Sequence, residues 1–183
     1  MNLPIVRYGD PVLRAKGKRI EIIDERVREL AAKMIETMHE AKGVGLAAQQ
    51  VGEALQLTVV DVAGAEDQAS TMTLNGAEVD PKISMPLILV NPELTLSDET
   101  AIGLEGCLSF PEITGDIRRS ISVVLRAQSL EGESLEIEAS GLLARALQHE
   151  VDHLNGILFI DRMSAATKVA LRSRLKRMQR GEW

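Results

Sequence analysis

Residues 141–156, with the sequence GLLARALQHEVDHLNG, predict a central helix around which the rest of the chain folds. Ser140 precedes this stretch and is a favourable N-cap residue, and Gly156 is a favourable residue for ending the helix. Four apolar side chains recur at helical spacing and can face a core: Leu143, Leu147, Val151 and Leu154.

The polar side chains of this helix include His149, Glu150 and His153, which form the pattern H-E-x-x-H. Residues four apart lie on one face of a helix, so both imidazoles can reach a single metal ion, with Glu150 beside it. The alternative is a coincidence of two histidines on a solvated face. In a chain with three histidines, the chance of this pattern around one of them is on the order of one in a thousand. We therefore favour a metal site.

A catalytic metal needs a third protein ligand and an open position for water. The downstream histidine of one class of zinc protease is absent, because Phe159 stands at its position. The remaining strong candidate is Cys107, the single cysteine, in an extended, glycine-flanked segment that could lie against the helix. A lone cysteine is more often a small buried residue, but two histidines in need of a third donor favour the ligand role. This donor set suits Zn²⁺ or Fe²⁺, and spacing does not choose between them.

Two further helices and four strands are predicted outside this stretch. One helix begins after the N-cap Asp24 and ends at Gly43, and another follows Ser164. Strand patterns cover residues 55–62, 87–94, 121–127 and 134–140. Helices do not alternate with strands, so we expect an α+β fold. Mixed, mostly antiparallel strands would pack around the central helix, with an N-terminal and a C-terminal helix.

Residues 43–52, GVGLAAQQVG, contain the G-x-G-x-x-A variant of the dinucleotide-binding pattern. That pattern requires a strand before the glycines and a helix after them, and here the predicted order is reversed. The context therefore excludes dinucleotide binding. A simple helix stop would explain Gly43, but not Gly45, the two alanines and Gln50 together. We interpret the stretch as one wall of a hydrolase site.

The composition describes a single soluble globular domain over residues 1–183. The net charge of −6 argues against DNA binding by the whole chain. The first residues lack the apolar segment of a signal peptide, and no apolar run is long enough to cross a membrane. We therefore expect a cytoplasmic protein without membrane contact. Residues 63–86 are polar, acidic and rich in turn residues, and we expect a surface excursion there, which could include a hairpin, with no assigned chemistry.

Three motifs, in this order, resemble those of the bacterial-type peptide deformylase family: GVGLAAQQ (43–50), EGCLS (105–109) and QHEVDH (148–153). The early YGDPVLR (8–14) is similar to the family's N-terminus as well. The resemblance spans nearly the whole chain, with residues 63–86 and the last helix as its least diagnostic parts. It implies an enzyme that removes the formyl group from the initiator methionine of nascent polypeptides and releases formate.

The resemblance also implies roles for single residues. The family's metal ligands are matched by Cys107, His149 and His153. Glu150 matches its general base and acid, and the Gln50 amide and the Leu108 N–H match its oxyanion donors. One divalent ion per chain is implied, with Fe²⁺ expected in the cell and Zn²⁺, Ni²⁺ or Co²⁺ able to take its place.

The same residues can perform hydrolysis on chemical grounds. A divalent ion in a site with three protein ligands lowers the pKa of bound water and supplies hydroxide, which attacks the formyl carbon. Glu150 can take the water's proton and later deliver it to the departing amine. The Gln50 amide and the Leu108 N–H can stabilise the oxyanion of the tetrahedral intermediate.

Substrate binding should rely on the peptide backbone, because nascent chains vary in sequence. An extended peptide could add to an exposed strand edge, with one apolar pocket for methionine. Candidates around pocket and edge, each with plain core as the alternative, are Val44, Gly45, Leu46 and Leu142. Arg145, one turn before His149, could lay its methylene stem along the pocket and keep its charge in water.

Other polar residues near the motifs keep open interpretations. Asp152 could support a ligand histidine or face water. Glu105 could form an ion pair with Arg118 and Arg119 that braces the cysteine segment, or this ion pair could be solvated at the surface. His39, near the end of the first helix, is interpreted as a partner of the helix dipole and not as a ligand.

Residues 165–183 are predicted as a basic C-terminal helix. Its cations have no acidic residue among them: Lys168, Arg172, Arg174, Lys176, Arg177 and Arg180. Such a run is usually a solvated face. On an enzyme of nascent chains it could instead dock on ribosomal RNA through phosphate contacts.

Two other functions share part of this pattern. A zinc endopeptidase uses the same H-E-x-x-H chemistry, but the missing downstream ligand, the upstream Cys107 and the small size of the chain argue against it. A non-catalytic metal-binding or interaction module is the second alternative. Such a module would have lost its catalytic activity, and the presence of every catalytic position named above argues against this.

Overall fold

The elements of the fold are those of a computed structural model, which describes residues 1–182. The helices in this range are α1 (Glu25–Glu40), α2 (Gly141–Leu154) and α3 (Ala165–Gln179). Short 3-10 helices are η1 (Pro11–Arg14), η2 (Ala48–Val51) and η3 (Phe159–Arg162). The strands are β1 (Gly45–Ala47), β2 (Leu57–Val60), β3 (Ser70–Leu74), β4 (Ala77–Val79), β5 (Leu87–Leu96), β6 (Thr100–Cys107), β7 (Phe110–Ser120), β8 (Ser122–Gln128) and β9 (Ser134–Ser140).

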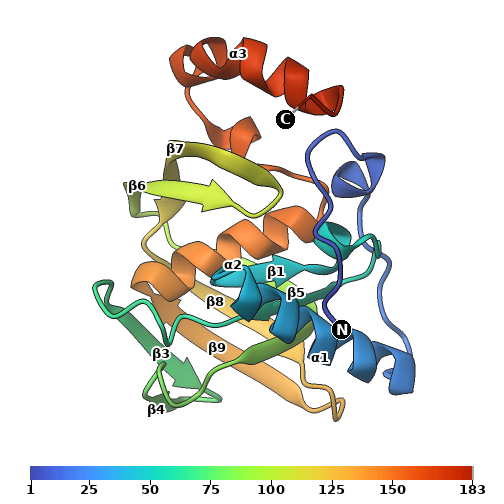
Figure 1. The fold of residues 1–183 in the computed structure, drawn as a ribbon. Helices are drawn as coiled ribbons and strands as arrows, with labels where there is room; N and C mark the ends of the chain where they lie inside the picture. Colours follow the sequence, from blue (N-terminus) through green and yellow to red (C-terminus); the bar gives the residue numbers. More distant parts are fainter. Residues whose placement is uncertain (183) are drawn as a thin grey trace.

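Helix α2 lies at the centre, between two β layers (Figure 1). One layer is a seven-stranded sheet in the order β1-β2-β5-β8-β9-β3-β4, in which neighbouring strands are antiparallel. The other is the antiparallel β6–β7 hairpin. Helix α1 packs beside β1 and β2, and α3 lies beyond the hairpin (Figure 1). The predicted α+β fold, with mostly antiparallel strands around a central helix, is confirmed.

The apolar face of α2 packs on the seven-stranded sheet. Leu143 and Leu147 are fully buried against it, and Val151 joins the same cluster. The sheet contributes Val60, Val62, Met72, Leu87, Leu89, Val123, Leu125, Ala127, Ile137 and Ala139. Full burial of one such side chain stabilises the fold by roughly 1.5–3 kcal/mol. This cluster therefore fixes α2 on the sheet and turns its polar face towards the hairpin.

The predicted N-terminal helix and four strands are present. Asp24 is the N-cap of α1, and its carboxylate accepts the Val27 N–H at 3.1 Å. The helix ends at Glu40, slightly earlier than predicted, and the Gly43 N–H then bonds the Met38 carbonyl at 2.9 Å. The strands predicted from the pattern correspond to β2, β5, β8 and β9. Within residues 1–182, no helix combines the length and the apolar character needed to cross a membrane.

The β6–β7 hairpin was not predicted beyond an extended segment around the cysteine. Burial alternates along β7, with Ile113, Gly115, Ile117 and Arg119 on the inner face. A glycine and an arginine among the inward positions hide the alternation of apolar and polar residues that marks a half-buried strand. The short strand β1 follows a glycine-rich run and was missed for a similar reason.

Residues 63–86, expected as a surface excursion, include the β3–β4 hairpin. Strand β3 pairs with β9 and so extends the main sheet, and Met72 enters its core at 4% exposure. The loop residues on either side are largely exposed.

Strand β3 also supplies the cap of α2. The Ser70 hydroxyl accepts the Leu143 N–H at 3.0 Å. Ser140 occupies the N-cap position, but its hydroxyl bonds to Thr71 and makes no cap hydrogen bond. The prediction that Ser140 caps this helix is therefore wrong. Gly141, with φ of +68°, turns the chain so tightly that the N-terminus of α2 meets β3 instead.

We expect Ser70→Ala to lower the free energy of unfolding by about 1 kcal/mol, the usual effect of losing a helix cap. In a chain of this size the melting temperature should fall by about 2–4 °C, measured by calorimetry. Ser140→Ala is the matched control, since its hydroxyl makes only an exposed side-chain contact; its effect should stay within about 0.5 kcal/mol. An equal or larger loss for Ser140→Ala would contradict this assignment of the cap.

Candidate metal centre and catalytic site

Three side chains from two elements converge on one point. The Cys107 Sγ at the end of β6 and nitrogens of His149 and His153 on α2 lie within 4.8 Å of one another. Cys107 Sγ is 3.3 Å from His153 Nε2, and the centroids of the two imidazole rings are 5.0 Å apart. Both histidines are buried and the cysteine is half-buried. The structure thus brings the three predicted ligands together.

Glu105 orients His149. Its Oε1 accepts the His149 Nδ1–H at 2.9 Å, so Nε2 is left to face the cluster. Burial raises the pKa of Glu105, but hydrogen bonds from His149 and Arg119 outweigh this effect and lower it to about 2. The carboxylate is therefore charged at neutral pH. A charged acceptor on Nδ1 fixes the tautomer and makes Nε2 a better metal donor.

Burial and neighbouring charged groups shift the pKa values of the two histidines in opposite directions. Burial lowers the pKa of His149, but hydrogen bonds to Cys107 and Glu105 outweigh it and raise the value to about 10. Burial, reinforced by the charge of His149, holds the pKa of His153 well below its ordinary value. His153 Nδ1 is buried without a hydrogen-bond partner among residues 1–182. One thiolate with two imidazoles is a donor set for Zn²⁺ or Fe²⁺, so the residues present fit a divalent ion.

Glu150 lies against the backbone of β1. A Cβ atom on Gly45 would lie 2.7 Å from the Glu150 Cγ and Cδ atoms, so a side chain at position 45 would displace the carboxylate. Glu150 is 4% exposed, and its Oε2 has no hydrogen-bond partner within the described chain. Burial raises its pKa to about 7. A carboxyl group that titrates near neutrality can both accept and return a proton.

Gln50 and Leu108 lie on the wall next to the cysteine. Gln50 Oε1 accepts the Ala47 N–H at 3.0 Å, which turns Nε2 towards the cluster. Nε2 donates to Ser109 Oγ at 3.2 Å and is 3.5 Å from Cys107 Sγ. Leu108 follows the cysteine in the turn between β6 and β7. Gln50 and Leu108 both line the cavity that contains Cys107.

A cavity of about 550 Å³ opens in front of the cluster. Its lining includes residues predicted to carry the chemistry: Gln50, Cys107, Leu108, His149 and Glu150. Four candidates for substrate contact also line it: Val44, Gly45, Leu142 and Arg145. Leu46 is instead fully buried in the core beneath α1, which was the alternative for this residue.

The charge of Arg145 is not in water. Nη1 donates to Glu105 Oε2 at 2.8 Å and to the Ile117 carbonyl at 2.9 Å. Nη2 donates to the Ala101 carbonyl at 3.0 Å, and the side chain is 17% exposed. The expectation of a solvated guanidinium is wrong, because a buried carboxylate and two carbonyl groups lie within its reach.

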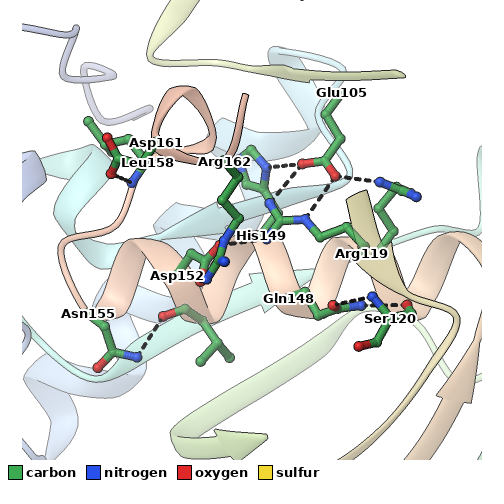
Figure 2. A network of polar contacts seen from close by, with 12 residues as sticks. Glu105, Arg119, Ser120, Gln148, His149, Asp152, Asn155, Leu158, Asp161 and Arg162 are labelled. Carbon is green, nitrogen blue, oxygen red and sulfur yellow. Dashed lines mark hydrogen bonds and ion pairs between the residues drawn. The ribbon is translucent and has the colours of Figure 1, made fainter. Parts of the chain in front are cut away.

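A network of ion pairs lies behind the ligands (Figure 2). Arg119 on β7 donates to both oxygens of Glu105 and to Asp152. Asp152 on α2 also accepts a bidentate pair from Arg162. Asp152 therefore does not face water, and the pair of Glu105 and Arg119 braces the cysteine segment from inside. Arg118 is exposed, which agrees with the alternative of a solvated surface residue.

Glu105 on β6 contacts α2 and β7, a larger role than the predicted pairing with Arg118 and Arg119. The available signal was its position two residues before Cys107, since such residues share one face of a strand. That signal is readable only when β6 is recognised as a strand. His39 bonds Asp61 at 2.8 Å in the last turn of α1 and is not part of the ligand cluster.

Comparison with known sequences finds one family of similar proteins. The sequence profile described as polypeptide deformylase matches residues 2–169. A peptide deformylase from Opitutus terrae is 49% identical over 178 residues, which cover 96% of this chain and 92% of the relative. One from Methylacidiphilum infernorum is 46% identical over 182 residues, covering 100% and 95%.

Solved structures agree as well. The peptide deformylase of Thermotoga maritima superimposes with a TM-score of 0.76 at 41% identity, covering 90% of this chain and 99% of that one. The enzyme of Thermus thermophilus gives a TM-score of 0.83 at 35% identity, covering 99% of each chain. The fold, the motifs and these similarities together show that the chain belongs to the polypeptide deformylase family of enzymes.

Proposed function

We propose that this chain hydrolyses the formyl group from the initiator methionine of nascent polypeptides and releases formate. The carrying observation is the placement of Glu150, a buried carboxyl whose Oε2 has no hydrogen-bond partner among residues 1–182, at one cavity with the cluster of Cys107, His149 and His153. Membership of the family supports this reaction. Residues 1–183 would act as one catalytic domain; Trp183 lies outside the described residues.

Cys107, His149 and His153 would hold one divalent ion. Fe²⁺ is the proposed ion in the cell, with Zn²⁺, Ni²⁺ or Co²⁺ as substitutes, because this mixed thiolate and imidazole set suits each of them. When bound, such an ion lowers the pKa of water towards neutrality and polarises a carbonyl group. Glu105 would keep His149 in the tautomer that can bind it.

Glu150 would take the proton of the attacking water and later deliver it to the departing amine. Its burial supports this role, because a carboxyl group with an ordinary pKa would be a poor acid at neutral pH. The absence of a side chain at Gly45 leaves it room at the cavity wall.

Gln50 and Leu108 would stabilise the oxyanion. The Gln50 amide is held by Ala47 and Ser109, so its donor needs little reorganisation when charge develops. The Leu108 N–H would be the second donor, from the turn next to the cysteine.

The substrate would bind as an extended strand. Strand β1 lies at an edge of the main sheet, so Val44 and Gly45 can offer backbone groups to a peptide. Leu142 and the stem of Arg145 would border the methionine pocket. We propose a cytoplasmic location, no contact with membranes or DNA, and docking on ribosomal RNA through α3.

The function is tested by formate release from formyl-Met-Ala-Ser under anaerobic conditions. Wild type should release formate, and Glu150→Gln should lose almost all turnover while it keeps a normal metal content. Cys107→Ser should lose both. The metal content is measured on the purified proteins by elemental analysis. A Glu150→Gln protein without metal would refute the assigned role, and cleavage of internal peptide bonds alone would favour an endopeptidase.

The oxyanion role predicts that Gln50→Ala lowers kcat by about 10²–10³ with a small change in KM, since the donor acts on the transition state. Its neighbour Gln49 is a matched control. Gln49 is equally buried, but its amide donates to the Ala15 and Leu154 carbonyls. Gln49→Ala should lower the melting temperature and leave kcat nearly unchanged. Equal kcat losses in the two variants would contradict a specific role for Gln50.

Ribosome docking predicts a salt-dependent interaction of α3. We choose Arg172, Lys176 and Arg177, because Lys168 and Arg174 make contacts within the protein. Their triple change to Gln should weaken co-sedimentation with ribosomes and flatten its dependence on salt. The same change at Arg19, Arg26 and Arg126 removes equal charge elsewhere and should have little effect. Equal losses in both triple variants would refute a specific role of α3.

A further inference from the structure

Strand β6 carries Cys107, yet it presents few apolar groups to α2. Residues two apart share a face of a strand, so Gly103 and Glu105 point to the same side as Cys107. On the opposite face Ile102 and Leu104 are 58% and 68% exposed. Hydrophobic burial therefore contributes little to holding β6 against α2, and polar contacts must do so.

Arg145 makes two of these polar contacts from α2 and adds a third to β7. Its guanidinium reaches the Ala101 carbonyl on β6, the Ile117 carbonyl on β7 and the Glu105 carboxylate. Ala101 is the ladder partner of Arg119, two residues from Ile117, so the guanidinium bonds the two strands at positions two residues apart in the ladder. A planar group with five N–H donors can make this set of contacts, whereas an ammonium group cannot reproduce its geometry.

Gly103 leaves the space that the guanidinium occupies. A Cβ atom on Gly103 would lie 2.9 Å from Arg145 Cζ and 3.0 Å from Nη2. A side chain at position 103 would therefore push the guanidinium out of its contacts. Gly103 and Arg145 fit each other as a pair.

The contacts of Arg145 lead directly to the ligand cluster. Glu105 Oε2 accepts from Arg145, and Oε1 of the same carboxylate accepts from His149. Along the chain, Glu105 lies two residues before Cys107, and Arg145 lies one turn before His149. The guanidinium thus holds both the carboxylate that orients one ligand and the strand that carries another.

We propose that Arg145 is a positioning residue of the metal centre, which sets Cys107 at its place opposite His149 and His153 by holding β6 and Glu105 to α2. The inference rests on the metal centre of the proposed function. It gives Arg145 a task beyond bordering the substrate pocket.

The test uses the full chain loaded with Zn²⁺ and follows the transfer of the metal to excess chromogenic chelator. Arg145→Leu should lose Zn²⁺ about 10-fold faster or more, as expected for a partner that supports a metal ligand. The rate of Zn²⁺ loss from Arg145→Lys should lie between the rates of Arg145→Leu and wild type. Arg126→Leu is the matched control, since Arg126 pairs with Glu136 at 2.8 Å on the exposed face of the sheet; its rate should equal that of wild type.

The glycine supplies a second, independent variant. Gly103→Ala should also speed Zn²⁺ loss, because the new methyl group displaces the guanidinium. In the double variant Gly103→Ala/Arg145→Leu the loss should be no faster than in Arg145→Leu alone, since no guanidinium remains to be displaced. With Co²⁺ bound, the thiolate charge-transfer band should weaken or shift in Arg145→Leu and stay unchanged in Arg126→Leu.

The outcomes separate this inference from the proposed function. Zn²⁺ retention and a Co²⁺ spectrum in Arg145→Leu equal to those of Arg126→Leu would overturn the positioning role alone. Fully additive effects in the double variant would overturn it as well. A lower melting temperature with unchanged Zn²⁺ loss, measured well below that temperature, would show a purely structural role. Wild type that takes up no metal would overturn the metal centre itself, and this inference with it.

Discussion

The buried carboxylate of Glu105 joins the parts of the molecule that make the site. It accepts hydrogen bonds from His149 and Arg145 on α2 and from Arg119 on β7. A buried charge is tolerated only when it is paired and hydrogen-bonded, and removal of one partner from such a pair typically costs about 3–5 kcal/mol. The positions of the β6–β7 hairpin and of α2 therefore depend on each other through the Glu105 carboxylate (Figure 2).

Apolar packing and polar contacts have different tasks in this fold. The core between α2 and the main sheet holds the two histidines and Glu150 at a fixed place. Ile113 and Ile117 of β7 pack in a separate apolar cluster with η3 and the end of α3. Between these two cores lie the charged groups, and the cavity opens at their edge. A metal ion bound there would bridge both cores, so its affinity should be coupled to the stability of the fold.

The strongest local patterns predicted their elements correctly, and weaker ones failed for identifiable reasons. Helix α2 and the strands β8 and β9 have periodic apolar residues that mark the buried face, and β2 and β5 begin as short apolar runs that are buried on both faces. In β7 the inward positions include Gly115 and Arg119, so the pattern is lost although the burial alternates. The cap of α2 was assigned to Ser140 because a cap is usually adjacent in sequence, whereas Ser70 approaches from another strand.

The sequence by itself determined the helix that carries H-E-x-x-H, the candidate for the third donor and the family that the motifs resemble. These conclusions rest on local spacing and on residue types, which require no knowledge of distant contacts. Only the tertiary structure decided that Glu105, Arg119 and Asp152 are buried partners, and that Arg145 is bound to the hairpin and not to solvent. A charged side chain takes its role from the partners that folding brings within hydrogen-bond distance, and for these residues the partners lie on other elements of the chain.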